Sequence, residues 1–135
     1  MTRTLLLLAA IALSSGCQSA KDASTAYFKV AGATEADTFV IALTDPSAIA
    51  EARAMVSGDA PSKHVTGLVV AEPAPYNKPW SFHLDPASIS FFEMSIEVCD
   101  AATTYVEEHL GEVGGAFLPG RRWCPWSSRV IAEVR

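Results

Sequence analysis

The 135-residue chain has three cysteines, one in an N-terminal segment and two in the predicted globular part. The positions of these cysteines limit how the chain can fold, because a disulfide would be a covalent constraint. Cys17 closes a short apolar stretch, whereas Cys99 and Cys124 form an even pair further along. In an exported chain such a pair indicates a disulfide, which would close a loop of about 25 residues and stabilise the fold by roughly 3 kcal/mol. Two free thiols are an alternative. A metal site is a third, but it needs further ligands and His109 is the only histidine between the two cysteines.

The N-terminus has the layout of an export signal. Arg3 supplies a positive charge, and an uninterrupted apolar run follows from Leu5 to Leu13. This run is too short to cross a membrane, because a spanning helix needs about 20 residues. An export signal is therefore the first interpretation of this segment.

The four residues that follow read SSGC and resemble a lipobox, in which the cysteine receives the lipid. Ser14 stands where leucine is usual, so an ordinary secretory signal and a cytoplasmic protein are kept as alternatives. Gln18 after the cysteine favours the outer membrane or the cell surface. The predicted organisation is a lipoprotein signal peptide over residues 1–16, a lipidated Cys17 with a polar tether over residues 17–25, and one domain over residues 26–135.

The charge of the chain narrows the range of partners. The formal charge is −5, and loss of Arg3 with the leader makes it −6. A nucleic acid requires a basic surface, so we expect no nucleic-acid partner. We also expect no electrostatic attraction to anionic lipid, so the predicted contact with the membrane is the lipid anchor itself.

Hydrophobic patterning predicts an α+β fold: an antiparallel sheet of five to six strands with two short helices and one disulfide. Asp45 and Pro46 begin the first helix and Gly58 ends it, with Val56 on its buried face. Thr104 and Glu107 form a capping box that begins the second helix. The expected strands are 27–32, 39–43, 65–71, 80–84, 89–99 and 129–134, and the expected helices are 46–57 and 105–113.

The segment from Ile89 to Cys99 fits two periodicities. As a strand it alternates Phe92, Met94, Ile96 and Val98 inward, whereas as a helix it aligns a different set of apolar residues. We favour the strand, because a new helix start follows at once. Met94 is then expected in the core.

Four aromatic residues in loops form the predicted binding surface. Tyr76 and Trp80 lie in a proline-rich loop, and Trp123 and Trp126 flank Cys124. Loops often carry function, and Trp and Tyr supply a large contact area with few torsions to freeze. The alternative is that these side chains cap the core around the disulfide.

A hydrolase is the alternative function. Ser81, His83 and Asp85 share one face of a short expected strand, which is a possible nucleophile, base and orienting group. Parallel neighbours on a strand seldom converge, and the chain has no Gly-x-Ser-x-Gly turn. We expect His83 to make a structural hydrogen bond into the Asp85-Pro86 turn instead.

Longer motifs resemble a family of small exported domains labelled calmodulin-binding-protein-like, after the N-terminal domain of a eukaryotic protein called BP-seventy-four. The motifs are FVIALTDPSAIAEAR at 39–53, PYNKPWSFHLDPASISFFE at 75–93, IEVCDA at 96–101 and FLPGRRWCPWSSR at 117–129. The resemblance runs from about Tyr27 to the C-terminus and implies no particular activity. Calmodulin is not an expected partner, because a lipobox implies a bacterium and the basic run from Arg121 to Arg129 is interrupted by Pro125.

The expected function is therefore a lipid-anchored envelope protein without enzymatic activity. It would bind a protein, peptide or glycan through its aromatic loops, or act as an inhibitor-like module through the rigid loop from Phe117 to Ser128. We expect no cofactor and no metal.

Overall fold

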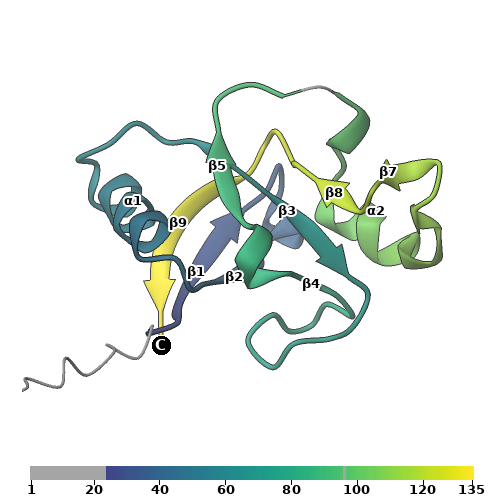
Figure 1. Ribbon diagram of the computed structural model, residues 1–135, viewed down its shortest axis with the longest axis horizontal. Coiled ribbons are helices and arrows are strands. Elements are labelled where there is room, and N and C mark those ends of the chain that lie inside the picture. Colours follow the sequence, from purple (N-terminus) through teal and green to yellow (C-terminus); the bar gives the residue numbers. More distant parts are fainter. Residues whose placement is uncertain (1–23, 96) are drawn as a thin grey trace, which may run out of the picture.

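The computed structural model describes residues 24–95 and 97–135 (Figure 1). The predicted signal peptide, the predicted lipidation site at Cys17, the first part of the predicted tether and Ile96 lie outside the described residues. None of the helices within the described ranges has the length and apolar character needed to span a membrane.

One antiparallel sheet holds the two ends of the domain together. Its strand order is β2 (Phe39–Leu43), β1 (Ala26–Ala31) and β9 (Arg129–Val134). Along β1, buried Phe28 and Val30 alternate with exposed Lys29, as expected for a strand with one face on the core. All three strands were predicted from the sequence and are confirmed.

The second sheet is organised by one strand, β3 (His64–Val70). It pairs antiparallel with β5 (Ser90–Phe92) at its start, with β4 (His83–Leu84) at its end, and with β8 (Arg122–Trp123) between them. A single strand therefore connects three distant segments of the chain.

The first helix, α1 (Pro46–Ser57), has the predicted limits. Oδ1 of Asp45 accepts a hydrogen bond of 2.8 Å from the N–H of Ala48, and Gly58 ends the helix with φ 82°. The buried positions are Ile49, Ala52 and Met55. The prediction that Val56 is buried is wrong: the helix turns Met55 to the core instead, and Val56 is 38% exposed.

The second helix is shorter than predicted and begins differently. Helix α2 (Thr103–Glu108) has Ala102 at its N-cap and no cap from its own side chains, so the predicted capping box is absent. The N–H of Thr104 instead donates a hydrogen bond of 3.3 Å to Oδ1 of Asp37. The remaining elements are short: η1 (Glu35–Asp37), η2 (Pro86–Ser88), η3 (Glu97–Cys99), η4 (Leu110–Glu112), and the parallel pair β6 (Val113–Gly114) and β7 (Phe117–Pro119).

The predicted strand over residues 89–99 is the main error. Only Ser90–Phe92 form a strand, because β3 begins at His64 and offers no partner beyond Phe92. The chain then leaves the sheet, and Met94 is 86% exposed rather than buried. The predicted strand over 80–84 is reduced for a similar reason to β4, which pairs with only the last two residues of β3.

Both sheets and both helices contribute to one core. Its largest fully buried side chains include Trp123, Phe28, Phe82 and Ile41. The disulfide between Cys99 and Cys124 is confirmed, with 5.1 Å between the two Cα atoms. The predicted α+β class, with antiparallel sheets, two helices and one disulfide, is likewise confirmed.

Candidate functional site

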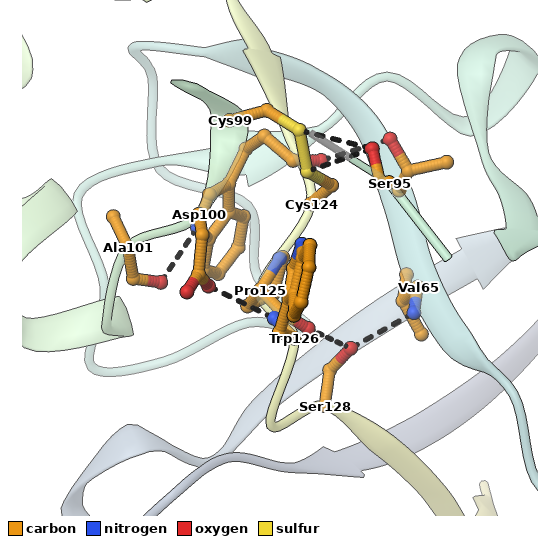
Figure 2. The surroundings of a disulfide bond; sticks show 11 residues. Val65, Ser95, Cys99, Asp100, Ala101, Cys124, Pro125, Trp126 and Ser128 are labelled. Carbon is orange, nitrogen blue, oxygen red and sulfur yellow. Dashed lines mark hydrogen bonds between the residues drawn. A yellow bond between two sulfur atoms is a disulfide. The ribbon is translucent and has the colours of Figure 1, made fainter. Parts of the chain in front are cut away.

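Figure 2 shows the disulfide between Cys99 and Cys124 with the residues that surround it. Both cysteines are buried, and the N–H of Cys124 donates to the carbonyl oxygen of Cys99 at 2.7 Å. Oγ of Ser95 lies 3.4 Å from Sγ of Cys99 and 3.5 Å from Sγ of Cys124. The chain before η3 and the chain after β8 are therefore joined by covalent and hydrogen bonds.

Three apolar side chains close in sequence to the two cysteines are exposed. Met94 is 86% exposed, Val98 63% and Trp126 38%. Met94 and Val98 come from the segment that leads to Cys99, and Trp126 is two residues beyond Cys124. We call these three residues the disulfide patch.

The backbone at Trp126 is held by hydrogen bonds to exposed Asp100 and, through buried Ser128, to Val65. The N–H of Trp126 donates to Oδ1 of Asp100 at 2.9 Å (Figure 2). Oγ of Ser128 donates to the carbonyl oxygen of Pro125 at 2.6 Å and accepts the N–H of Val65 at 2.8 Å. The backbone that carries Trp126 is therefore held in place by hydrogen bonds to two other segments of the chain.

Trp123, predicted as part of a binding surface, is fully buried. Its ring packs against Phe39 and Phe82, with ring centroids 4.8 and 5.6 Å apart. Its Nε1–H donates to the carbonyl oxygen of Ala101 at 2.9 Å. The prediction of a surface role for Trp123 is therefore wrong, because pairing of β8 with β3 turns this side chain into the core.

Trp80 fixes the proline-rich loop to the sheet. Its Nε1–H donates to the carbonyl oxygen of Thr38 at 2.8 Å, at the free edge of β2. Buried Asn77 also connects this loop to β2, because its Oδ1 accepts a hydrogen bond of 2.7 Å from the N–H of Val40. Its Nδ2 donates to the carbonyl oxygen of Phe82 at 2.9 Å. These side chains cover a sheet edge that would otherwise be open to pairing.

Tyr76 occupies a different place from the disulfide patch. Its ring lies 5.1 Å from that of Tyr27 and 6.2 Å from that of His83. Burial raises the pKa of Tyr76, and the electrostatic interactions with Tyr27 and Asp85 add to this effect. The four predicted aromatic residues are thus not one cluster, and among them Trp126 is an exposed large apolar side chain close in sequence to the disulfide.

The three residues of the hydrolase alternative each have a different partner. Ser81 donates from its N–H and its hydroxyl to the carboxylate of Glu107, at 2.9 and 2.6 Å. Nδ1 of His83 donates to the carbonyl oxygen of Glu72 at 2.7 Å rather than into the following turn. Asp85 accepts the N–H of Ala87 at 3.0 Å. These hydrogen bonds do not connect Ser81 to His83, or His83 to Asp85, as the predicted hydrolase site requires.

The loop proposed for an inhibitor-like module has no free extended segment at its basic residues. Arg121 has φ 62°, and its carbonyl oxygen accepts the N–H of Val69 at 2.9 Å. Arg122 pairs with Leu68 across β3 and β8. The central part of this loop is therefore strand β8, which is paired with β3.

Three polar residues that position these surfaces were missed by the sequence analysis: Asp37, Asn77 and Ser128. Each is buried and hydrogen-bonded to a segment far away in the chain. A single buried polar residue has no periodicity, so local patterns give no sign of it. Among residues 24–95 and 97–135, no group of three or more His, Cys, Asp or Glu is placed to hold a metal.

Comparison with known families gives one finding. The sequence model of the family described as the BP-seventy-four N-terminal domain matches residues 24–135. This description names no reaction. Neither the curated proteins nor the solved structures contain a match to the chain.

Proposed function

The chain belongs to the family of BP-seventy-four N-terminal domains, and on that premise we propose that it is a non-enzymatic domain that binds a protein or peptide at the disulfide patch. The lipid on Cys17 would hold the domain at the outer membrane or the cell surface. Secretion without a lipid is the alternative address.

The observation that carries this proposal is the concentration of exposed apolar side chains. The described residues expose six large apolar side chains, and three of them form the disulfide patch. Scattered exposed apolar residues need no explanation, but a group of them on a rigid support is typical of an interaction site. Trp and Met are also enriched at protein interfaces, which favours a protein or peptide over a glycan.

The position of the start of β1 supports the same proposal. β1 begins beside the C-terminus at one edge of the molecule, and the segment that joins β5 to α2 runs along the opposite edge (Figure 1). Met94 and Val98 belong to that segment. An anchor that precedes β1 would therefore attach to the domain at the end opposite to the segment that carries Met94 and Val98.

The test is crosslinking in the native envelope with the full-length protein. A photoreactive residue at Met94 should crosslink one defined species, and one at Val56 should not. With the photoreactive residue kept at Met94, the double variant Val98→Ser, Trp126→Ser should lose that species, because it removes the other two apolar side chains of the disulfide patch. Val56→Ser is the matched control, since it removes an exposed apolar side chain from α1. The proposal fails if both variants retain the crosslinked species equally.

A further inference from the structure

A second surface lies on the other side of the three-stranded sheet from the core. A hollow of about 620 Å³ opens between β1, η1 and β9. We call it the basic groove. Its lining residues are Lys29, Ala31, Gly32, Ala33, Thr34, Glu35, Thr38, Arg129 and Ile131.

The hollow exists because its floor has almost no side chains. Ala31, Gly32 and Ala33 follow one another where β1 leads into η1. At Gly32 a Cβ atom would collide with Cβ of Asp37 and would lie 2.8 Å from its carbonyl oxygen. The close packing of buried Asp37 thus requires glycine here.

Two cations share this hollow. Ala31 pairs with Arg129 across β1 and β9, so Lys29, two residues before Ala31, is the diagonal neighbour of Arg129 on the same face. Both are exposed, and neither forms a salt bridge within the part of the chain that the structure describes. Like charges at such positions repel, and a bound anion would relieve the repulsion.

The other groups of the groove limit the kind of anion. Glu35 contributes one negative charge, so the local charge is that of a site for a monoanion rather than a dianion. A bulge in the pairing of β1 with β9 leaves Ile131 without a partner on β1, and its apolar side chain is 44% exposed beside the two cations. Apolar surface next to a pair of cations matches a carboxylate on a short hydrocarbon chain.

We propose that the basic groove binds a small aliphatic monocarboxylate. The carboxylate lies between Lys29 and Arg129, and the hydrocarbon chain contacts Ile131 and Ala33. This site shares no residue with the disulfide patch, so the two proposals stand or fall separately.

The test is a titration of the isotope-labelled full-length protein with butyrate at constant ionic strength. The backbone amide signals of Gly32 and Thr38 should shift and saturate. Butylammonium, with the opposite charge, should leave them unchanged. Ile131→Ser should weaken binding of butyrate more than binding of acetate, since only butyrate has a chain long enough to contact this residue.

The variants separate a built site from general electrostatics. The double variant Lys29→Gln, Arg129→Gln should weaken butyrate binding by about tenfold or more, the loss expected for a charge-assisted hydrogen bond. Arg121→Gln, Arg122→Gln removes the same charge from another exposed surface and should bind like the wild type. Shifts that do not saturate, or equal weakening in both double variants, overturn the proposal. Phosphate binding as tight as that of butyrate overturns the assignment to a monocarboxylate.

Discussion

The carboxylate of Asp37 accepts hydrogen bonds from Thr104 in the first turn of α2, far along the chain. Its Oδ1 accepts the N–H of Thr104 at 3.3 Å and the hydroxyl of the same residue at 3.1 Å. The hydroxyl of Thr34 donates to Oδ2 of Asp37 at 2.8 Å. The hydroxyl of Thr103 donates to the backbone carbonyl oxygen of Asp37 at 2.6 Å. One residue of η1 thus fixes the start of α2.

Asp37→Asn should destabilise the protein by about 1–3 kcal/mol at neutral pH, the usual cost of losing a buried hydrogen bond to a charged group. Burial alone would raise the pKa of Asp37, but the hydrogen bonds from Thr34 and Thr104 together outweigh it and hold this pKa below its ordinary value. The stability from the carboxylate is therefore complete above the unfolded-state pKa and disappears as pH falls through the lower, folded-state pKa.

Chemical denaturation of wild type and Asp37→Asn from neutral pH down into strong acid measures this contribution. The difference in unfolding free energy should be constant near neutrality and shrink in acid. Glu35→Gln, an exposed acid in the same element, is the control and should show little difference. A difference independent of pH would contradict the charge-based explanation.

Gly32→Ala should destabilise the fold by about 1–3 kcal/mol, because the added methyl group would overlap the backbone and Cβ of Asp37. Gly111→Ala is the matched control: nothing lies within 4 Å of a Cβ at this position, and a change within about 0.5 kcal/mol is expected. Thermal unfolding of the two variants measures the contrast. Equal effects would show that the packing of Gly32 against Asp37 is not tight in solution.

Asn77→Asp should cost about 2 kcal/mol, since an aspartate has nearly the same shape but cannot donate to the carbonyl oxygen of Phe82. Hydrogen exchange should then increase at the amide of Val40, which Asn77 protects at the edge of β2. Lys78→Ala, at the neighbouring position, should leave both properties unchanged. Unaltered exchange at Val40 in Asn77→Asp would argue against this role.

Reduction of the disulfide should lower the unfolding free energy by about 3 kcal/mol, from the gain in chain entropy of the unfolded state. It should also release Met94 and Trp126 from their common support and abolish the crosslink expected at Met94. The double variant Cys99→Ala, Cys124→Ala should behave like the reduced protein and show no further response to reductant. A reductant effect that persists in this variant would point to another cause.

His83→Ala should lower stability by about 1 kcal/mol, through loss of the hydrogen bond to the carbonyl oxygen of Glu72. It should not change the rate at which the protein hydrolyses a simple activated ester, because Ser81 is bound by Glu107 rather than by His83. Ser81→Ala is the companion variant. If both variants abolished a measurable esterase activity while remaining folded, the hydrolase alternative would have to replace the binding proposal.

The elements that the sequence predicts well are those with local signals. Helix α1 has Asp45 and Pro46 at its start and Gly58 at its end, and its predicted limits agree with the structure. Strands β1, β2 and β9 were found from their runs of apolar residues. The segment after Phe92 continues the same alternation, yet it leaves the sheet, because the length of β3 rather than the pattern decides where pairing stops.

The candidate site depended still more on distant contacts. Trp123 and Trp126 lie close together in the sequence and have similar local surroundings. One is buried because β8 pairs with β3, and the other is exposed because the chain turns outward after Pro125. The cap of α2 could not be foreseen either, since nothing near Thr104 indicates that Asp37 provides it.

The pairing of Tyr27 with Val134 places the beginning and the end of the domain side by side. A short linker could therefore join the two ends, and the exposed turn at Gly58 could supply new ones, so the domain is suited to circular permutation. By the same geometry it could be inserted into a surface loop of another protein, entering and leaving its host at nearly the same point.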